Sequence, residues 1–423
     1  METDTTRRDF LGRAGAAAAG FLPSVARGQE DRAGARLGVG FLGAGGRANS
    51  HIGMLLKLQK AGEPVDLVAV YDTYRPRAER AARRCGEDVR VYTSYRDLLA
   101  DPRVHAVCIA TPDHHHGYQA IDAVRAGKDV YCEKPVTHWR QFDLTKKLAE
   151  VVAGSDRVFL LGTQGMSDGA WALMKRLVRE GLIGPPIHAE CGYFRVGDWG
   201  ERGMPIDDKN AQPGDALNWE EFLGDAPKRP FDVSRYFRWR MYEDYAGGPA
   251  TDLFPHSFTP VADILALTFP CRAVGTGGKF RYEEREVPDT FNMLLDYPEK
   301  ITVAVLGTQG NDHPGASGGR GAPGRIPTIR GWDGTLTVQG NEVVFIPAQG
   351  CKKPAQRFPI EYGEDNVRYW KHFLDCCRRR DRNTLSPMDL AYRVQTALIM
   401  GYLSLRENKV AKFDPDRQRI VLL

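Results

Sequence analysis

The chain has 423 residues, of which 42% are hydrophobic and 26% charged, a balance typical of a folded globular protein rather than a disordered or fibrous one. Its 58 basic and 54 acidic residues nearly cancel and are mixed along the chain, which argues against a nucleic-acid partner. Eight cysteines without paired spacing predict neither a disulfide framework nor a metal site, and no 18-residue apolar run predicts stable membrane insertion. The length suggests two domains.

Residues 1–26 are predicted to be a twin-arginine signal peptide. Adjacent Arg7 and Arg8 precede a weakly apolar run that ends in the small residues 24–26, as a signal peptidase requires. Such a signal exports a protein that is already folded, so we expect a periplasmic or extracytoplasmic location. The alternative is a chance arginine pair on a disordered terminus. Residues 27–35 are predicted to be a linker.

Short apolar runs then alternate with helical segments. Strands are expected at residues 37–42, 65–71, 104–110, 130–132 and 158–161, with helices between them at 76–85, 118–126 and 141–153. This alternation predicts a parallel sheet with helices on both faces. Ligands of such sheets bind at the carboxyl ends of the strands, so the residues after each strand are the candidates for a site.

A glycine-rich turn follows the first predicted strand. Residues 43–48 read G-A-G-G-R-A, which fits the G-x-G-x-x-A pattern of a dinucleotide-binding turn. The first glycine permits the tight turn, the second lets the backbone approach a pyrophosphate, and Ala48 lets helix and strand pack closely. The phosphates would face a helix N-terminus. The predicted cofactor contacts are Gly43, Ala44, Gly45, Gly46 and Arg47.

Asp72 ends the second predicted strand, 29 residues after Gly43. Its carboxylate is predicted to accept the ribose hydroxyls of NAD. An acidic residue repels the 2′-phosphate of NADP, so NAD is the expected cofactor, although Arg75 or Arg77 would make NADP possible. The alternative role for Asp72 is a helix cap.

Two further strand ends carry cofactor candidates. T-P-D-H-H-H follows the third strand, where we expect a loop over the nicotinamide ribose, with His116 capping the next helix. The three histidines invite a metal site as the alternative, but neighbours in an extended segment point to opposite sides. E-K-P follows the fourth strand and places a lysine beside the cofactor's reactive ring; the alternative is a surface ion pair of Lys134 with Glu133. The candidates here are Thr111, Pro112, His116, Glu133, Lys134 and, after the fifth strand, Gln164.

Together the glycine turn, T-P-D-x-x-H and E-K-P resemble the Gfo/Idh/MocA family of glucose–fructose oxidoreductases and inositol dehydrogenases. The resemblance implies a Rossmann domain (residues 36–165) followed by an α/β domain with a large, open, mostly antiparallel sheet (166–365). It also implies hydride transfer between NAD(P) and a sugar or cyclitol carbon, and a homodimer or homotetramer. Helical spacing predicts that residues 366–423 form closing helices that pack back on the first domain.

The segment G-G-P-A-T-D-L-F-P-H at residues 247–256 resembles a catalytic segment of that family. The resemblance implies that His256 is the general base and acid, that Lys134 holds or protonates the reacting oxygen, and that Asp252 orients the substrate or His256. On one helix, Asp252 and His256 would share a face. A core histidine and a helix-capping aspartate are the alternatives. Phe254 and Thr259 depart from the family pattern, which suggests an unusual substrate.

Aromatic and arginine side chains suit sugars and carboxylates, although they are also ordinary core residues. The substrate candidates on this ground are Tyr193, Arg195, Trp199, Tyr236, Trp239 and Arg240. Residues 307–330 are rich in glycine and proline and predict a loop over the pocket or at an oligomer contact.

We therefore expect an exported, NAD(P)-dependent oxidoreductase that acts on a carbohydrate or cyclitol. Because soluble NAD is not expected outside the cytoplasm, the cofactor should stay bound and be regenerated by a second sugar. The first alternative is a redox-neutral glycosidase that oxidises, eliminates and reduces again. The second is a non-catalytic NAD- or sugar-binding protein, which the joint presence of Lys134, Asp252 and His256 argues against.

Overall fold

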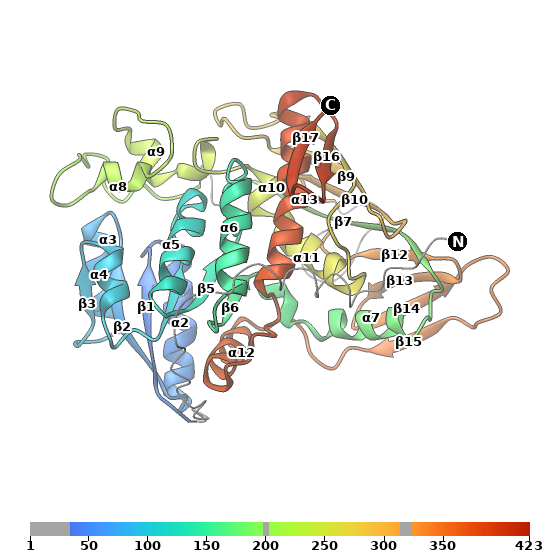
Figure 1. Cartoon of the computed structure of the whole chain (residues 1–423), viewed down its shortest axis with the longest axis horizontal. Helices are drawn as coiled ribbons and strands as arrows, with labels where there is room; N and C mark the ends of the chain where they lie inside the picture. Colours follow the sequence, from blue (N-terminus) through green and yellow to red (C-terminus); the bar gives the residue numbers. More distant parts are fainter. Residues whose placement is uncertain (1–33, 198–202, 314–323) are drawn as a thin grey trace, which may run out of the picture.

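The computed structural model describes residues 34–197, 203–313 and 324–423. The predicted signal peptide and the candidate Trp199 therefore lie outside the described residues. The chain forms two sheets, one in each half of an elongated molecule, with α13 (Met388–Glu407) standing between them (Figure 1). Within the described ranges, no helix has both the length and the apolar composition needed to cross a bilayer.

The first sheet is fully parallel, in the order β3-β2-β1-β4-β5-β6. Its order reverses between β1 and β4, which creates the crevice where ligands bind in such folds. All residues of these two central strands are buried. The strands are β1 (Leu37–Leu42), β2 (Val65–Tyr71), β3 (Arg90–Tyr92), β4 (Ala106–Ile109), β5 (Asp129–Glu133) and β6 (Phe159–Gly162); the helices are α2 (Gly46–Lys60), α3 (Arg75–Cys85), α4 (Tyr95–Ala100), α5 (Asp113–Arg125) and α6 (Phe142–Ala153).

The second sheet has eleven strands and is antiparallel except where β10 pairs with β7. The two sheets together confirm the predicted fold class. On one face the sheet packs against α7 (Gly169–Arg179), α11 (Phe254–Ile264) and α13. The strands are β7 (Pro186–Val196), β8 (Arg272–Gly278), β9 (Thr290–Asp296), β10 (Thr302–Thr308), β11 (Gly310–Asn311), β12 (Thr328–Gly331), β13 (Gly334–Gln339), β14 (Glu342–Pro347), β15 (Gln356–Pro359), β16 (Ala411–Asp414) and β17 (Arg419–Leu422).

The end of the chain joins both halves. Helix α12 (Asn366–Arg379) packs against α2, and the hydroxyl of Tyr369 donates to the carbonyl of Leu161 at 2.5 Å. Helix α13 contacts both α6 and β8. The prediction of closing helices is incomplete, because the chain after α13 continues as β16 and β17, and β16 pairs with β8 in the second sheet.

Residues 203–245, here called the bridging segment, leave the second half and cover one end of the first. They contain α8 (Trp219–Leu223), α9 (Val233–Phe237) and the 3-10 turn η2 (Trp239–Met241), which share an aromatic cluster (Figure 1). The backbone N–H of Asn218 donates to Thr73 and that of Arg75 donates to Ala216, each at 2.9 Å. These bonds fix the bridging segment to the chain that follows β2.

The predicted glycine- and proline-rich loop is shorter than expected. Gly307 and Thr308 end β10, β11 pairs with β7, and β12 begins at Thr328. Residues 314–323 lie outside the described part of the chain.

Candidate active site

The glycine turn lies at the crevice of the parallel sheet. Gly43 has φ +90, and a Cβ on it would lie 2.7 Å from the carbonyl oxygen of Ala110, so the close approach of the two strand ends requires glycine. Helix α2 begins at Gly46, and a Cβ there would meet no atom within 4 Å. The turn thus leaves an open cradle at a helix N-terminus, the geometry that accepts a pyrophosphate.

A cavity of about 340 Å³ extends from this turn. Three of the predicted cofactor residues outside the turn, Asp72, Thr111 and Pro112, line it as well. The bridging segment closes it from the other half of the molecule with Met204, Tyr236, Trp239, Arg240 and their neighbours. The cavity and its lining fit a dinucleotide whose adenosine end lies near Asp72.

Asp72 is held by two backbone donors. Its carboxylate accepts from the N–H of Ala44 at 2.7 Å and from that of Tyr74 at 2.8 Å. Burial raises its pKa, and the charge of Arg77 opposes that rise. Since Tyr74 is the N-cap residue of α3 and no side chain caps it, Asp72 is not the cap of that helix. Each carboxylate oxygen accepts more than one hydrogen bond, so a ribose hydroxyl still has an acceptor here.

His116 does not cap a helix, contrary to expectation. Helix α5 starts at Asp113 with Pro112 as its N-cap, so the histidine lies inside the helix. Its Nδ1 is 2.6 Å from the carbonyl oxygen of Pro135, and its Nε2 is 2.8 Å from that of Thr111. The ring therefore ties the loop after β4 to the loop after β5.

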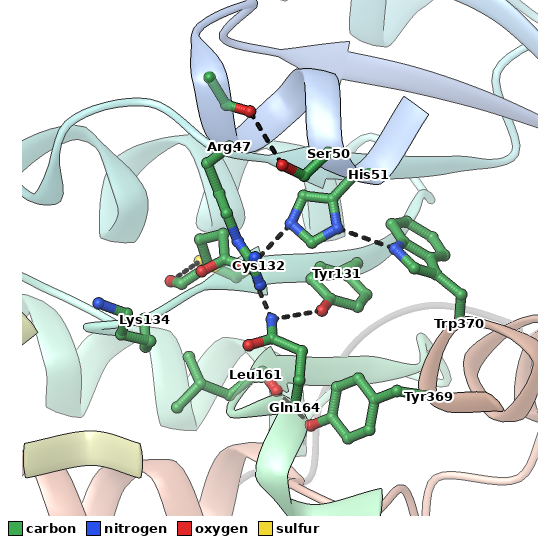
Figure 2. Close-up of polar contacts among 12 residues, drawn as sticks. Arg47, Ser50, His51, Tyr131, Cys132, Lys134, Leu161, Gln164, Tyr369 and Trp370 are labelled. Atoms are coloured by element: carbon green, nitrogen blue, oxygen red, sulfur yellow. Dashed lines mark hydrogen bonds and ion pairs between the residues drawn. The ribbon is translucent and has the colours of Figure 1, made fainter. Parts of the chain in front are cut away.

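Glu133 is the centre of a buried polar network rather than a surface ion pair with Lys134. It is 4% exposed and accepts from Arg47 Nε at 2.9 Å, His51 Nε2 at 2.8 Å and Gln164 Nε2 at 2.7 Å. Burial alone would raise the pKa of Glu133, but the charge of Arg47 and the bond from His51 hold it well below its usual value. In Figure 2 these side chains converge on the end of β5, whereas Lys134 stands apart from them.

Trp370 of α12 determines which ring nitrogen of His51 carries the proton. Its indole N–H donates to Nδ1 of His51 at 2.9 Å, so the proton of the neutral ring is on Nε2 and is donated to Glu133 (Figure 2). Burial lowers the pKa of His51, which keeps the ring neutral. Trp370 also stacks on Tyr131 with a centroid distance of 4.3 Å. The closing helix α12 thereby supports the strand end that carries Lys134.

Lys134 meets Asp252 across the two halves of the chain. Its Nζ donates to Oδ1 of Asp252 at 2.7 Å, and the guanidinium groups of Arg240 and Arg195 lie 3.3 and 3.8 Å from the same carboxylate. Burial opposes ionisation, but the charges of Lys134, Arg240 and Arg195 hold the pKa of Asp252 well below its usual value. A lysine ammonium is thus fixed beside the cavity by an ionised aspartate.

Asp252 and His256 do not share one helix, which corrects the predicted arrangement. The helix breaks at Leu253 between α10 (Pro249–Asp252) and α11, and among the described contacts no hydrogen bond joins the two side chains. Burial lowers the pKa of His256 well below its usual value, and the charge of Lys134 lowers it further. His256 is therefore a neutral imidazole within electrostatic range of Lys134.

The substrate candidates divide between two places. Tyr193 and Arg195 follow the buried Ala189 and Cys191 at every second position of β7, so they lie on its helix-covered face, where Arg195 pairs with Asp252. Tyr236 shares a hydrogen bond of 2.7 Å with Thr73 and lies near Asp72, at the adenosine end of the cavity. Trp239 and Arg240 line the same cavity, with the guanidinium 4.1 Å from the indole centroid.

Three functional features escaped the sequence analysis. Asp113 is buried next to the site and accepts from Thr251 at 3.2 Å; its position in T-P-D was a visible signal. His51 and Trp370 carried no motif. His115 lines the cavity, and its Nε2, like that of His114, lies against the carbonyl oxygen of Phe222, at 2.8 and 2.7 Å.

Two family models match the chain: an oxidoreductase family with an NAD-binding Rossmann fold over residues 37–163, and the C-terminal α/β domain of an oxidoreductase family over residues 170–270. Together they cover more than half of the chain. This protein belongs to the Gfo/Idh/MocA oxidoreductase family. The match confirms the predicted NAD-binding Rossmann domain, in a family of sugar and cyclitol oxidoreductases.

Among curated relatives, the Gfo/Idh/MocA chain is similar to a levoglucosan dehydrogenase of Pseudarthrobacter phenanthrenivorans, with 30% identity over 209 residues, and to an inositol 2-dehydrogenase of Gluconacetobacter diazotrophicus, with 29% over 185 residues. These matches cover 48% and 43% of this chain and 45% and 54% of the relatives, about half of their length. The aldose–aldose oxidoreductase of Caulobacter crescentus, crystallised with glycerol, shares the fold at a TM-score of 0.64 and 18% identity, over 89% of this chain and all of that one.

Proposed function

We propose that this protein moves hydride between a nicotinamide and a hydroxyl-bearing carbon of a carbohydrate or cyclitol, with its cofactor retained after export. The observation that carries the proposal is the Lys134–Asp252 pair at 2.7 Å beside a neutral His256, joined to the cavity by Arg240, which lines it and lies 3.3 Å from Asp252. Oxidising a C–OH group needs a base for the hydroxyl proton and a cation where alkoxide charge grows.

Each residue has a distinct part in this proposal. The bound nicotinamide supplies the hydride acceptor. The neutral imidazole of His256 takes the hydroxyl proton and returns it in the reverse direction. The ammonium of Lys134 stabilises the negative charge on the oxygen, and Asp252 keeps that ammonium in position through the bond at 2.7 Å.

Retention of the cofactor is supported by the way in which both halves of the chain enclose the cavity. The glycine turn and Asp72 form one wall, and Met204, Trp239 and Arg240 of the bridging segment form the other. The hydrogen bonds of the bridging segment to Thr73 and Arg75 hold this second wall in place. A retained cofactor is what an enzyme outside the cytoplasm requires, and the proposed export rests on the sequence of residues 1–26.

A bound cofactor must be recycled within one enzyme, and oxidation of one sugar coupled to reduction of another achieves this. The aldose–aldose oxidoreductase with the same fold bears a name that describes such an exchange between two sugars. The decisive test has two parts. Purified protein that is denatured is expected to release about one NAD(H) per chain. Native protein incubated with mixed free sugars and glycosides should give paired oxidised and reduced products, which mass spectrometry detects.

Three outcomes separate the candidates. Paired products support exchange, and cleavage of glycosides without net oxidation supports the redox-neutral glycosidase instead. Protein that releases no nucleotide, or whose nicotinamide absorbance never responds to sugars, contradicts the redox proposal and leaves a binding protein.

We also propose a homodimer or homotetramer. The face of the second sheet opposite α11 and α13 carries no helix in the described part of the chain. Val274 and Leu294 lie on this face as cross-strand partners, and they are 42% and 53% exposed. Two large apolar side chains exposed side by side on an open sheet face are the kind of surface that a second copy covers.

A further inference from the structure

Four charged groups from both halves of the chain lie at or next to the ribose end of the cavity, and two of them, Asp72 and Arg77, line it. Arg77 and Arg80 lie on the first turns of α3, and both pair with Asp207 of the bridging segment. Arg77 donates to the two oxygens of Asp207 at 2.7 and 3.0 Å, a bidentate pair. Residue 207 as a whole is exposed, but its side chain is only 13% exposed, and that of Arg77 is 15% exposed. Asp72 is the fourth group.

An arginine shortly after the second strand is what a Rossmann domain uses to hold the 2′-phosphate of NADP. Arg77 has the right place, since it lines the cavity together with Asp72, and a Cβ on Gly45 would lie 3.9 Å from its guanidinium. The sequence therefore left NADP possible. In the structure, however, the planar fork of Arg77 is already occupied by a carboxylate of matching geometry.

We propose that Asp207 makes this site selective for NAD by neutralising Arg77 and Arg80 at the place where a 2′-phosphate would bind. This inference rests on the NAD site of the proposed function. Among the described residues, the two arginines and the two aspartates at this end sum to no net charge. A phosphate that arrives there meets two carboxylates and must displace one of them from both arginines, whereas a ribose hydroxyl needs only the acceptor that Asp72 offers.

Asp207 lies outside the Rossmann domain, so selectivity depends on a residue about 130 positions downstream of the arginines it controls. It also means that the bridging segment is docked by the same ion pairs that exclude the phosphate. A variant that loses these pairs should both accept NADP and hold its nucleotide less tightly.

The test measures which nucleotide the protein holds, not its turnover. Wild type and each variant are expressed in the same cells and purified, and the nucleotides that co-purify with each protein are released by acid and quantified by mass spectrometry. Wild type should hold NAD. Asp207→Asn frees both arginines, and the ratio of bound NADP to NAD should rise on the order of tenfold, the effect of one charge-assisted hydrogen bond. Asp207→Ser serves the same purpose if the first variant does not fold.

Two controls make the result specific. Asp208→Asn changes the adjacent aspartate, whose carboxylate accepts from the backbone of Asn210 at 2.8 Å, and should keep the wild-type ratio. Asp207→Asn combined with Arg77→Gln and Arg80→Gln should lose the gain in NADP. Wild-type selectivity in both Asp207 variants, or a gain that survives the loss of both arginines, overturns this inference but leaves the NAD site standing. Wild-type protein that holds neither nucleotide overturns the NAD site itself.

Discussion

At the scale of single residues, the ammonium of Lys134 should decide turnover. Replacing it with alanine removes the cation that faces the growing alkoxide, so sugar-dependent reduction of the bound nicotinamide should slow on the order of a thousandfold, while the nucleotide stays bound. Single-turnover absorbance measures the first effect and nucleotide content the second. Unchanged turnover would remove Lys134 from the mechanism.

The chain offers a matched control for that variant. Lys175 donates to Asp263 at 2.6 Å, which is again a lysine–aspartate pair, but between α7 and α11. Lys175→Ala should therefore keep the wild-type rate. A comparable loss in both variants would mean that the effect of Lys134→Ala comes from disturbed folding.

Asp113 should give the stability of the protein a pH dependence. Burial raises its pKa to about 7, against the opposing charges of Arg240 and Lys134. In the unfolded chain the same carboxyl ionises near pH 4. Between these values the folded state binds the extra proton, so this contribution is present in acid and is lost as the pH rises through 7. Asp113→Asn cannot ionise and escapes the loss.

Relative to wild type, the free energy of unfolding of Asp113→Asn should therefore improve from pH 5 to pH 8, by on the order of 3 kcal/mol. Urea denaturation at the two pH values measures this difference. An identical difference at both pH values, or a variant that is relatively weaker at pH 8, would contradict a buried, proton-holding Asp113.

Which residues could be predicted depends on how local their signal is. Asp72 and Lys134 directly follow strands, so the strand pattern alone located them. His51, Trp370 and Asp207 act through contacts between distant parts of the chain, and no spacing rule connects positions that only the fold brings together. Glu133 was found as a cofactor candidate, but its burial beneath Arg47 was not predictable.

At the scale of elements, α12 should stabilise the carboxyl end of β5 through one hydrogen bond. Trp370→Phe keeps the stacking on Tyr131 but removes the N–H that Nδ1 of His51 accepts. A buried acceptor is then left without its donor, so chemical denaturation should show a loss of about 1–3 kcal/mol. Trp332→Phe, at a tryptophan that is 69% exposed, should cost little.

If Trp370→Phe is as stable as wild type, the hydrogen bond from the indole N–H to Nδ1 of His51 does not stabilise the fold.

The elements predicted best were those whose burial is uniform. β1 and β4 are wholly buried apolar runs and were recognised, whereas β3 is an edge strand of three residues that are exposed or half-buried. β16 was missed because its pairing with β8 joins residues far apart in sequence, and β17 pairs with β16. The break at Leu253 follows from Pro255, which cannot donate its backbone nitrogen within a continuous helix.

At the scale of the whole molecule, the open face of the second sheet should govern assembly. Val274 and Leu294 are register partners on adjacent strands β8 and β9, and their neighbours Ala273 and Leu295 point to the helix-covered side. An arginine at each position would place two charges on the surface that a second copy covers. Val274→Arg/Leu294→Arg should therefore run as a monomer in light scattering coupled to size exclusion.

The control places the same charge on an apolar side chain elsewhere. Val91 is 37% exposed on the edge strand β3 of the first sheet, so Val91→Arg should leave the mass of the assembly unchanged. Because α13 separates the open face from the NAD cavity, the double variant should still retain nucleotide. A wild-type protein that is monomeric at micromolar concentration, or a double variant with the wild-type mass, would show that this face is not the interface between copies.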